Sequence, residues 1–96
     1  MNVKVSFHRV DHSDALEFFI QEKSNKLKKF IQDPKRLNWV IDFQDKLFKP
    51  RLNILLNGKF VSVKSKADNA FVAVNEVMSK AQRLLSKHHA KMVKLH

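Results

Sequence analysis

The last third of the chain has the periodicity of an amphipathic helix. From Asp68 to the C-terminus there is neither Gly nor Pro, and apolar residues recur at steps of three, four and seven. Such spacing puts them on one face of a helix. This predicted apolar stripe consists of Phe71, Val74, Met78, Ala81, Leu85 and Met92. A basic stripe lies roughly opposite, and no acid follows Glu76. Its members are Lys80, Arg83, Lys87 and Lys91.

A first helix is expected to follow an N-terminal strand, because residues 2–8 alternate between apolar and polar. Ser13 offers a hydroxyl as the N-cap, and Asp33-Pro34 ends the helix, since proline drives the preceding residue out of the helical region. The stripe of this helix is Leu16, Phe19, Ile20, Leu27, Phe30 and Ile31. Lys23 falls near its centre. It either extends its ammonium to solvent over a buried stem or is a basic group held at a groove between helices.

The middle of the chain predicts three further strands. Residues 37–44 alternate like a strand, and we interpret residues 45–50 as a connection closed by Pro50. Asn57-Gly58 is the preferred pair for a type I′ hairpin turn, which fixes the register of its flanks. The predicted pairs are Leu56 with Lys59, Leu55 with Phe60, Ile54 with Val61, Asn53 with Ser62, Leu52 with Val63 and Arg51 with Lys64.

The order of elements predicts an α+β fold, a βαβββα two-layer sandwich. A right-handed crossover makes the first two strands parallel, whereas the hairpin strands are antiparallel. Each helix has one apolar stripe, so both should cover the same face of a four-stranded mixed sheet. The length of 96 residues suits a single domain over residues 1–96.

The net charge of +10 indicates an anionic partner, because a net charge with a magnitude of about 2 to 8 is enough to keep a small domain soluble. Nucleic acid is the commonest such partner. The outer face of the hairpin is also basic, with Lys49, Arg51, Lys64 and Lys66. Facing like charges cost stability. Either an anion offsets this cost, or water tolerates it and the lysines protect a sheet edge from aggregation.

Catalytic and metal chemistry find little support. The single Gly excludes a P-loop, and the adjacent residues Asp11-His12-Ser13-Asp14 suit a helix cap better than a catalytic relay. His88, Met92 and His96 form a loose helical row without Cys or acid, a weak ligand set. We expect no catalytic residue, metal or cofactor.

The sequence also bears on the compartment and on surface aromatics. No apolar run approaches the roughly 18 residues that span a bilayer, and the N-terminus lacks the apolar region of a signal peptide. We therefore expect a cytoplasmic protein without a membrane partner. Phe18 and Phe60 fall outside the predicted core. Each is either a base-stacking group or an ordinary exposed apolar side chain.

Over nearly its whole length the chain resembles the bacterial ribosome hibernation-promoting factors and the related ribosome-associated inhibitor. The resemblance lies in the SDAL start of the first helix, the KSNKLKKF segment, the LLNGKF hairpin, the DNAFVAVN entry to the last helix and its KAQRLLSKHHAKM stripe. It implies a βαβββα fold like that of the double-stranded RNA-binding domain. It also implies a non-enzymatic protein that binds the small ribosomal subunit and 16S rRNA in the mRNA and tRNA channel. The implied rRNA contacts are Lys23, Lys26, Lys29, Lys80, Arg83, Lys87 and Lys91.

The resemblance also implies a biological setting. The chain ends at His96 without an acidic tail or a second domain, as in the short hibernation-promoting type. That type acts in stress and stationary phase, and it pairs 70S ribosomes into inactive 100S dimers with a separate ribosome modulation factor. Off the ribosome we expect a monomer. The alternatives are a general double-stranded RNA-binding protein and a module that docks on an acidic protein.

Overall fold

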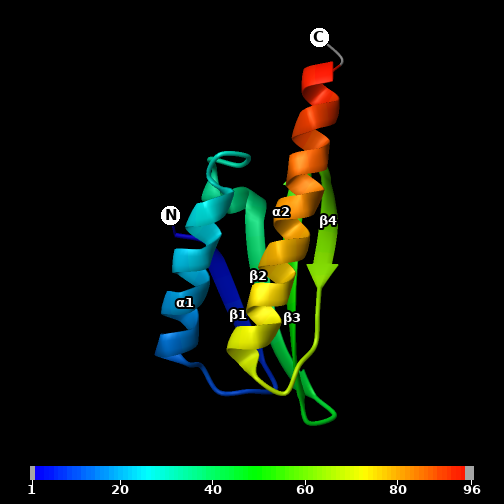
Figure 1. Ribbon diagram of the computed structural model, residues 1–96. Coiled ribbons are helices and arrows are strands. Elements are labelled where there is room, and N and C mark those ends of the chain that lie inside the picture. The colour runs from blue at the N-terminus through cyan, green and yellow to red at the C-terminus, as the bar shows by residue number, and fades with distance from the viewer. Residues whose placement is uncertain (1, 95–96) are drawn as a thin grey trace.

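The structure is a computed structural model that describes residues 2–94, with only the course of the helix given for residues 90–94. Its elements follow the order βαβββα, with two short 3₁₀ turns between the first helix and the second strand (Figure 1). The strands are β1 (Lys4–His8), β2 (Leu37–Gln44), β3 (Leu47–Leu56) and β4 (Lys59–Lys64). The helices are α1 (Asp14–Ser24) and α2 (Ala70–Lys94), and the 3₁₀ turns are η1 (Asn25–Leu27) and η2 (Pro34–Arg36).

The four strands form one mixed sheet in the order β1-β2-β3-β4. β1 runs parallel to β2, and the other neighbours are antiparallel. Figure 1 shows α1 and α2 side by side over one face of the sheet. The predicted α+β sandwich is therefore confirmed, and within residues 2–94 no helix covers the other face of the sheet.

The core lies between this sheet and the two helices. The buried apolar residues of α1 are Leu16 and Ile20. On α2 the buried residues are Ala73, Val74, Val77, Met78, Ala81 and Leu85. Ala73 and Val77 were missing from the predicted stripe, which instead included Phe71. Phe71 is 38% exposed and lies against Phe19 of α1, edge to face at 5.0 Å between ring centroids. Met92 lies beyond the described side chains.

Both helix starts are capped by side chains. The Ser13 hydroxyl accepts a hydrogen bond from the Leu16 amide at 3.2 Å, which confirms the predicted cap. α2 begins at Ala70, two residues later than predicted. The Asn69 carboxamide oxygen accepts from the amides of Phe71 and Val72 at 2.9 and 3.1 Å. An Asn at this position satisfies amide groups that have no partner within the helix.

The first helix ends earlier than predicted. α1 stops at Ser24, nine residues before Asp33, and η1 continues the chain. Leu27 and Ile31 remain buried, so their apolar spacing correctly predicts burial but not α-helix. Ser24 is fully buried, and its hydroxyl accepts from the Trp39 indole at 3.0 Å.

The interpretation of residues 45–50 as a connection was wrong. Asp45 and Lys46 alone form the turn, both with positive φ (58° and 64°), and β3 begins at Leu47. Pro50 is buried inside β3 opposite Ile41. A central strand forms backbone hydrogen bonds with a neighbour on each side, and proline lacks the N–H that one of these bonds needs. The regular ladder with β4 ends beside it, where the Ser65 amide donates to the Pro50 carbonyl at 3.3 Å.

The second hairpin follows the prediction in every pair. Its six cross-strand partners, from Leu56 with Lys59 to Arg51 with Lys64, are those that the turn implied. Asn57 and Gly58 both have positive φ, 51° and 77°, as a type I′ turn requires.

Candidate nucleic-acid interface

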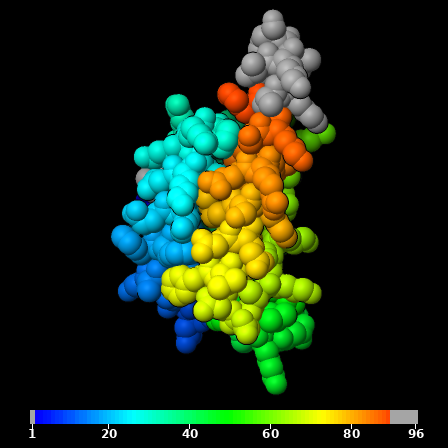
Figure 2. Space-filling model, viewed as in Figure 1, coloured from blue at the N-terminus to red at the C-terminus, as the bar shows by residue number. Residues whose placement is uncertain are grey.

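A groove of about 490 Å³ separates the end of the first helical segment from α2. It lies on the helix-covered side of the molecule, where Figure 2 shows the cyan turn after α1 beside the orange part of α2. Lys29 comes from that turn and Arg83 from α2, and both are exposed. The remaining lining residues carry no charge: Phe30, Ser79, Gln82 and Ser86. We call this the helix groove. It brings together two predicted RNA contacts that are 54 positions apart in the sequence.

Aromatic side chains support the helix groove. The Lys29 ammonium lies 5.1 Å from the centroid of the Phe30 ring, a favourable cation–π placement. The Phe30 ring also meets His89 of α2, edge to face at 6.2 Å. His88, next to it on α2, is half-buried. The groove therefore presents two cations with hydroxyl and amide groups between them, a set that suits phosphate oxygens.

Lys87 extends the basic surface along α2. It is exposed, and it follows Arg83 by four residues, so the two side chains lie one turn apart on the helix. Lys91 belongs to the same helix by its backbone, but its side chain lies outside the described residues, as do those of Met92 and His96.

Lys80 is directed away from the helix groove. Its ammonium donates to the backbone carbonyl of Lys64 at the end of β4, at 2.9 Å. The predicted basic stripe is therefore divided, with Arg83 toward α1 and Lys80 toward the edge of the sheet. A stripe on a helical wheel gives the angle of a side chain but not which neighbouring element its long stem reaches.

Lys23 and Lys26 lie next to each other at the end of the first helical segment. Lys23 is half-buried, and its ammonium lies 5.2 Å from the centroid of the Phe19 ring. The like charge of exposed Lys26 lowers the pKa of Lys23, and partial desolvation adds to the effect. The Lys23 ammonium thus lies over an aromatic ring, and the residue is half-buried at the side of α1. Neither residue lines the helix groove.

A second basic surface occupies the helix-free face of the sheet. A groove of about 660 Å³ lies there, near the end of β4. We call it the sheet groove. Its cationic lining residues are Lys49, Arg51, Lys64, Lys66 and Lys80, and its carboxylates are Asp42 and Glu76. The sequence had indicated four of these cations as the outer hairpin face. It gave no sign that Lys80 and Glu76 of α2 would join them.

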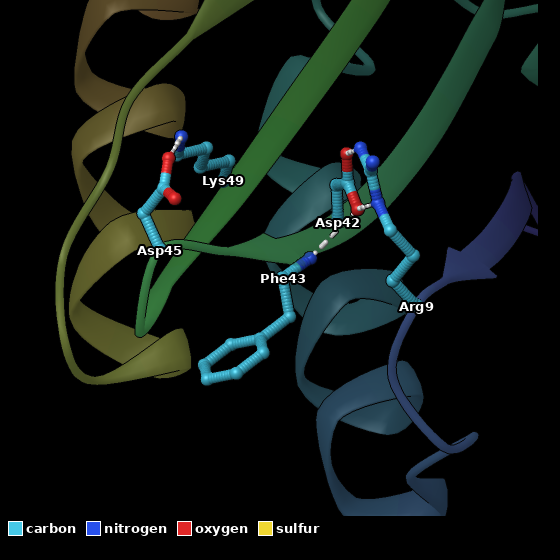
Figure 3. Close-up of polar contacts among 5 residues, drawn as sticks. All are labelled: Arg9, Asp42, Phe43, Asp45 and Lys49. Carbon is cyan, nitrogen blue, oxygen red and sulfur yellow. Dashed lines mark hydrogen bonds and ion pairs between the residues drawn. The ribbon is translucent and has the colours of Figure 1, made fainter.

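Figure 3 shows how the carboxylate of Asp42 is held. Arg9, in the left-handed conformation (φ 57°) after β1, forms a two-point ion pair with Asp42, and its Nε lies 2.9 Å from Oδ1. The Phe43 amide also donates to this carboxylate at 2.8 Å. The Arg9 hydrogen bond, with a smaller part from the Phe43 amide, lowers the pKa of Asp42 to about 2. Sequence reasoning predicted that β1 and β2 are parallel but missed this pair, since it depends on the register that sets His8 opposite Asp42 and on the left-handed backbone at Arg9.

The remaining chemistry expected from the sequence can be placed. His12 lies 3.3 Å from both Asp14 and Glu17 on the exposed start of α1, and Ser13 caps the helix. Within residues 2–94, no group of three or more His, Cys, Asp or Glu side chains is arranged to hold a metal ion. No helix in that range is long and apolar enough to cross a membrane.

Comparisons with known proteins agree with this architecture. Residues 3–93 match the family model described as Sigma 54 modulation protein / S30EA ribosomal protein. A ribosome hibernation promoting factor of Azotobacter vinelandii is 23% identical over 93 residues, which cover 97% of this chain and 87% of that protein.

Two solved structures share the fold. A ribosomal subunit interface protein from Coxiella burnetii superposes with a TM-score of 0.75 at 20% identity, covering 94% of this chain and 99% of the other. The N-terminal domain of Thermus thermophilus Protein Y gives 0.74 at 16% identity, covering 92% and 99%. Because the family model spans almost the whole sequence, this chain belongs to the Sigma 54 modulation protein / S30EA ribosomal protein family, the ribosome hibernation factors that its sequence resembles.

Proposed function

We propose that this protein is a non-catalytic ribosome hibernation factor. It binds the 30S subunit and the 70S ribosome as a monomeric single domain. It occupies the channel of mRNA and tRNA, contacts 16S rRNA and stops translation. With a separate ribosome modulation factor it promotes inactive 100S dimers in stationary phase and stress, in the cytoplasm.

The observation that carries this proposal is the pairing of Lys29 and Arg83 across the helix groove, in a chain that belongs to a family of ribosome-associated proteins. The groove contains two cations and no carboxylate. Lys87 adds a third cation one turn further along α2. Cations in such a row neutralise successive phosphates and position a protein on RNA without reading its sequence.

The other expected contacts take separate roles. Lys23 and Lys26 add positive charge beside the helix groove, on the α1 side. Lys80 reaches the edge of the sheet instead, so we assign it a contact with a different RNA segment. Lys91 prolongs the series beyond the described side chains.

Co-sedimentation with ribosomes tests the proposal. Purified protein is layered with 30S subunits or 70S ribosomes on a sucrose gradient, and it should travel with both at moderate salt. The variant Lys29→Glu/Arg83→Glu should stay at the top of the gradient. Addition of the wild-type protein to a cell-free translation reaction should lower protein synthesis, and 100S particles should form when the modulation factor is supplied.

The matched control is Lys35→Glu/Lys59→Glu, which changes the net charge equally. Both lysines are exposed, and neither lines either groove. The control should still sediment with ribosomes. If the wild-type protein does not sediment with 30S or 70S particles, the proposal is wrong. If an excess of random duplex RNA removes it from ribosomes as efficiently as free ribosomes do, it is a general double-stranded RNA-binding protein.

A further inference from the structure

The face of the sheet that carries no helix contains the sheet groove. Alternate residues of a strand point to opposite faces, and Leu52, Ile54 and Val63 are buried toward the helices. The residues between them therefore point outward. On β3 and β4 these are the cross-strand pairs Arg51 with Lys64, Asn53 with Ser62, and Leu55 with Phe60.

The positive charge of the sheet groove is not neutralised from within. Arg51 and Lys64 face each other directly across β3 and β4, a like-charge arrangement that costs stability in the absence of an anion. Among the side chains that the structure describes, no carboxylate forms an ion pair with Arg51, Lys64 or Lys66.

Both carboxylates of the sheet groove already have partners. Asp42 is held by Arg9 (Figure 3), and Glu76 accepts a hydrogen bond from the Ser65 hydroxyl. The carboxylate of Asp45 lies 3.5 Å from the ammonium of Lys49. The groove therefore keeps a surplus of cations, and Lys80, fixed to the Lys64 carbonyl, adds one at its rim.

An aromatic platform follows the cations along the same face. Phe60 is 60% exposed and pairs with half-buried Leu55. Between them and the Arg51–Lys64 pair, the Ser62 hydroxyl donates to the Asn53 side-chain oxygen at 2.6 Å. Phe60 stands four residues from Lys64 on one strand, about 13 Å along the sheet. Cations at one end and an exposed ring at the other suit a chain of phosphates and bases.

We propose that this face binds single-stranded RNA, with phosphates in the sheet groove on Arg51, Lys64 and Lys66 and with a base stacked on Phe60. The aromatic ring favours a nucleotide chain over free phosphate or a lipid headgroup, since only the former brings a flat π surface. It favours a single strand over a duplex, because duplex bases are already stacked on one another. The site is distinct from the helix groove and does not depend on the proposed function.

The test uses the full chain and a fluorescein-labelled oligouridylate of 12 nucleotides, which forms no duplex. Fluorescence anisotropy at low salt should show binding. Arg51→Glu/Lys64→Glu should weaken it at least tenfold and reduce the slope of log affinity against log salt by about 0.7 for each lost phosphate contact. Phe60→Ala should weaken binding at least fivefold, as expected for loss of one stacked base.

Matched variants separate this surface from overall charge. Lys35→Glu/Lys59→Glu alters the net charge equally and should weaken oligonucleotide binding less than threefold. Lys29→Glu/Arg83→Glu should match that control here, although it should abolish ribosome binding. Arg51→Glu/Lys64→Glu keeps a facing like-charge pair, so its stability should remain close to that of the wild type. If it fails to fold, Arg51→Gln/Lys64→Gln takes its place.

Amide chemical shifts of the ¹⁵N-labelled protein locate the contact. Addition of the oligonucleotide should shift the amides of residues 51–66 on β3 and β4. The proposal is overturned if the shifts are confined to α1 and α2, or if the sheet-face variants bind as well as the charge control. Failure of the wild-type protein to sediment with ribosomes would instead overturn the proposed function and leave this assay unaffected.

Discussion

The indole Nε1 of Trp39 donates a hydrogen bond to the Ser24 hydroxyl at 3.0 Å, and neither residue exposes any surface. This bond joins the last residue of α1 to the third residue of β2. It satisfies the polar atom of the largest core side chain, which would otherwise be buried without a partner.

Replacement of Ser24 by Ala should destabilise the protein by about 1–3 kcal/mol, because it leaves a buried donor unpaired. Urea unfolding measures the change. Ser86→Ala, at an exposed position of α2, should stay within about 0.5 kcal/mol of the wild type. In a double-mutant cycle, Trp39→Phe should cost less in the Ser24→Ala background than alone, since the orphaned donor is gone. If the effects of the two substitutions on the free energy of unfolding are additive, the hydrogen bond does not contribute to stability.

Gly58 should be hard to replace for reasons of the backbone alone. Its φ is +77°, and a Cβ built there meets no atom within 4 Å. Gly58→Ala should therefore cost about 1 kcal/mol through the left-handed conformation and not through a clash. Gly58→Asn should cost less, because Asn tolerates this region better. Thermal unfolding of the two variants checks the order, and equal losses would point to a cause other than φ.

The Arg9–Asp42 pair should make stability depend on pH in the acid range. The pKa of Asp42 in the folded protein is about 2, below its ordinary value of 3.8. A lowered carboxyl pKa stabilises the fold above pH 3.8, and this contribution is lost as the pH falls toward 2. Asp42→Asn should therefore reduce the urea midpoint at pH 6, and the difference from the wild type should shrink between pH 4 and 2. A constant difference would argue against the pair.

Replacement of Lys80 should mainly lower stability, whereas replacement of Lys87 should mainly weaken ribosome binding. The Lys80 ammonium donates a hydrogen bond to the Lys64 carbonyl, whereas the Lys87 side chain is exposed on α2. Lys87→Ala should lower the salt slope of ribosome binding by about one and leave the unfolding midpoint unchanged. Lys80→Ala should lower the midpoint and affect ribosome binding less. Pelleting assays at several salt concentrations, together with urea unfolding, decide between this outcome and two equal effects.

Much of the fold could be predicted because its signals are local. Asn57-Gly58 determines its turn through φ alone, so all six hairpin pairs follow from two residues. The apolar stripes of both helices and the βαβββα order then leave few ways to cover one sheet. The turn at Asp45 and Lys46 escaped prediction, because Lys is uncommon at the positive φ that this turn requires and Pro50 normally disfavours a central strand. The end of the β4 ladder beside it makes Pro50 acceptable.

The candidate site, too, could be predicted only in part from the sequence. The sequence by itself determined that the protein is strongly basic and that α2 carries cations opposite its apolar stripe. Only the tertiary structure decided which cations meet. Packing of α2 against the first helical segment places Arg83 and Lys29 on one groove, while Lys80 donates a hydrogen bond to the end of β4. The register of β1 against β2, which sets His8 opposite Asp42, brings Arg9 to Asp42. The period of a helix fixes directions around one axis, whereas contacts between elements depend on long-range packing that no local pattern encodes.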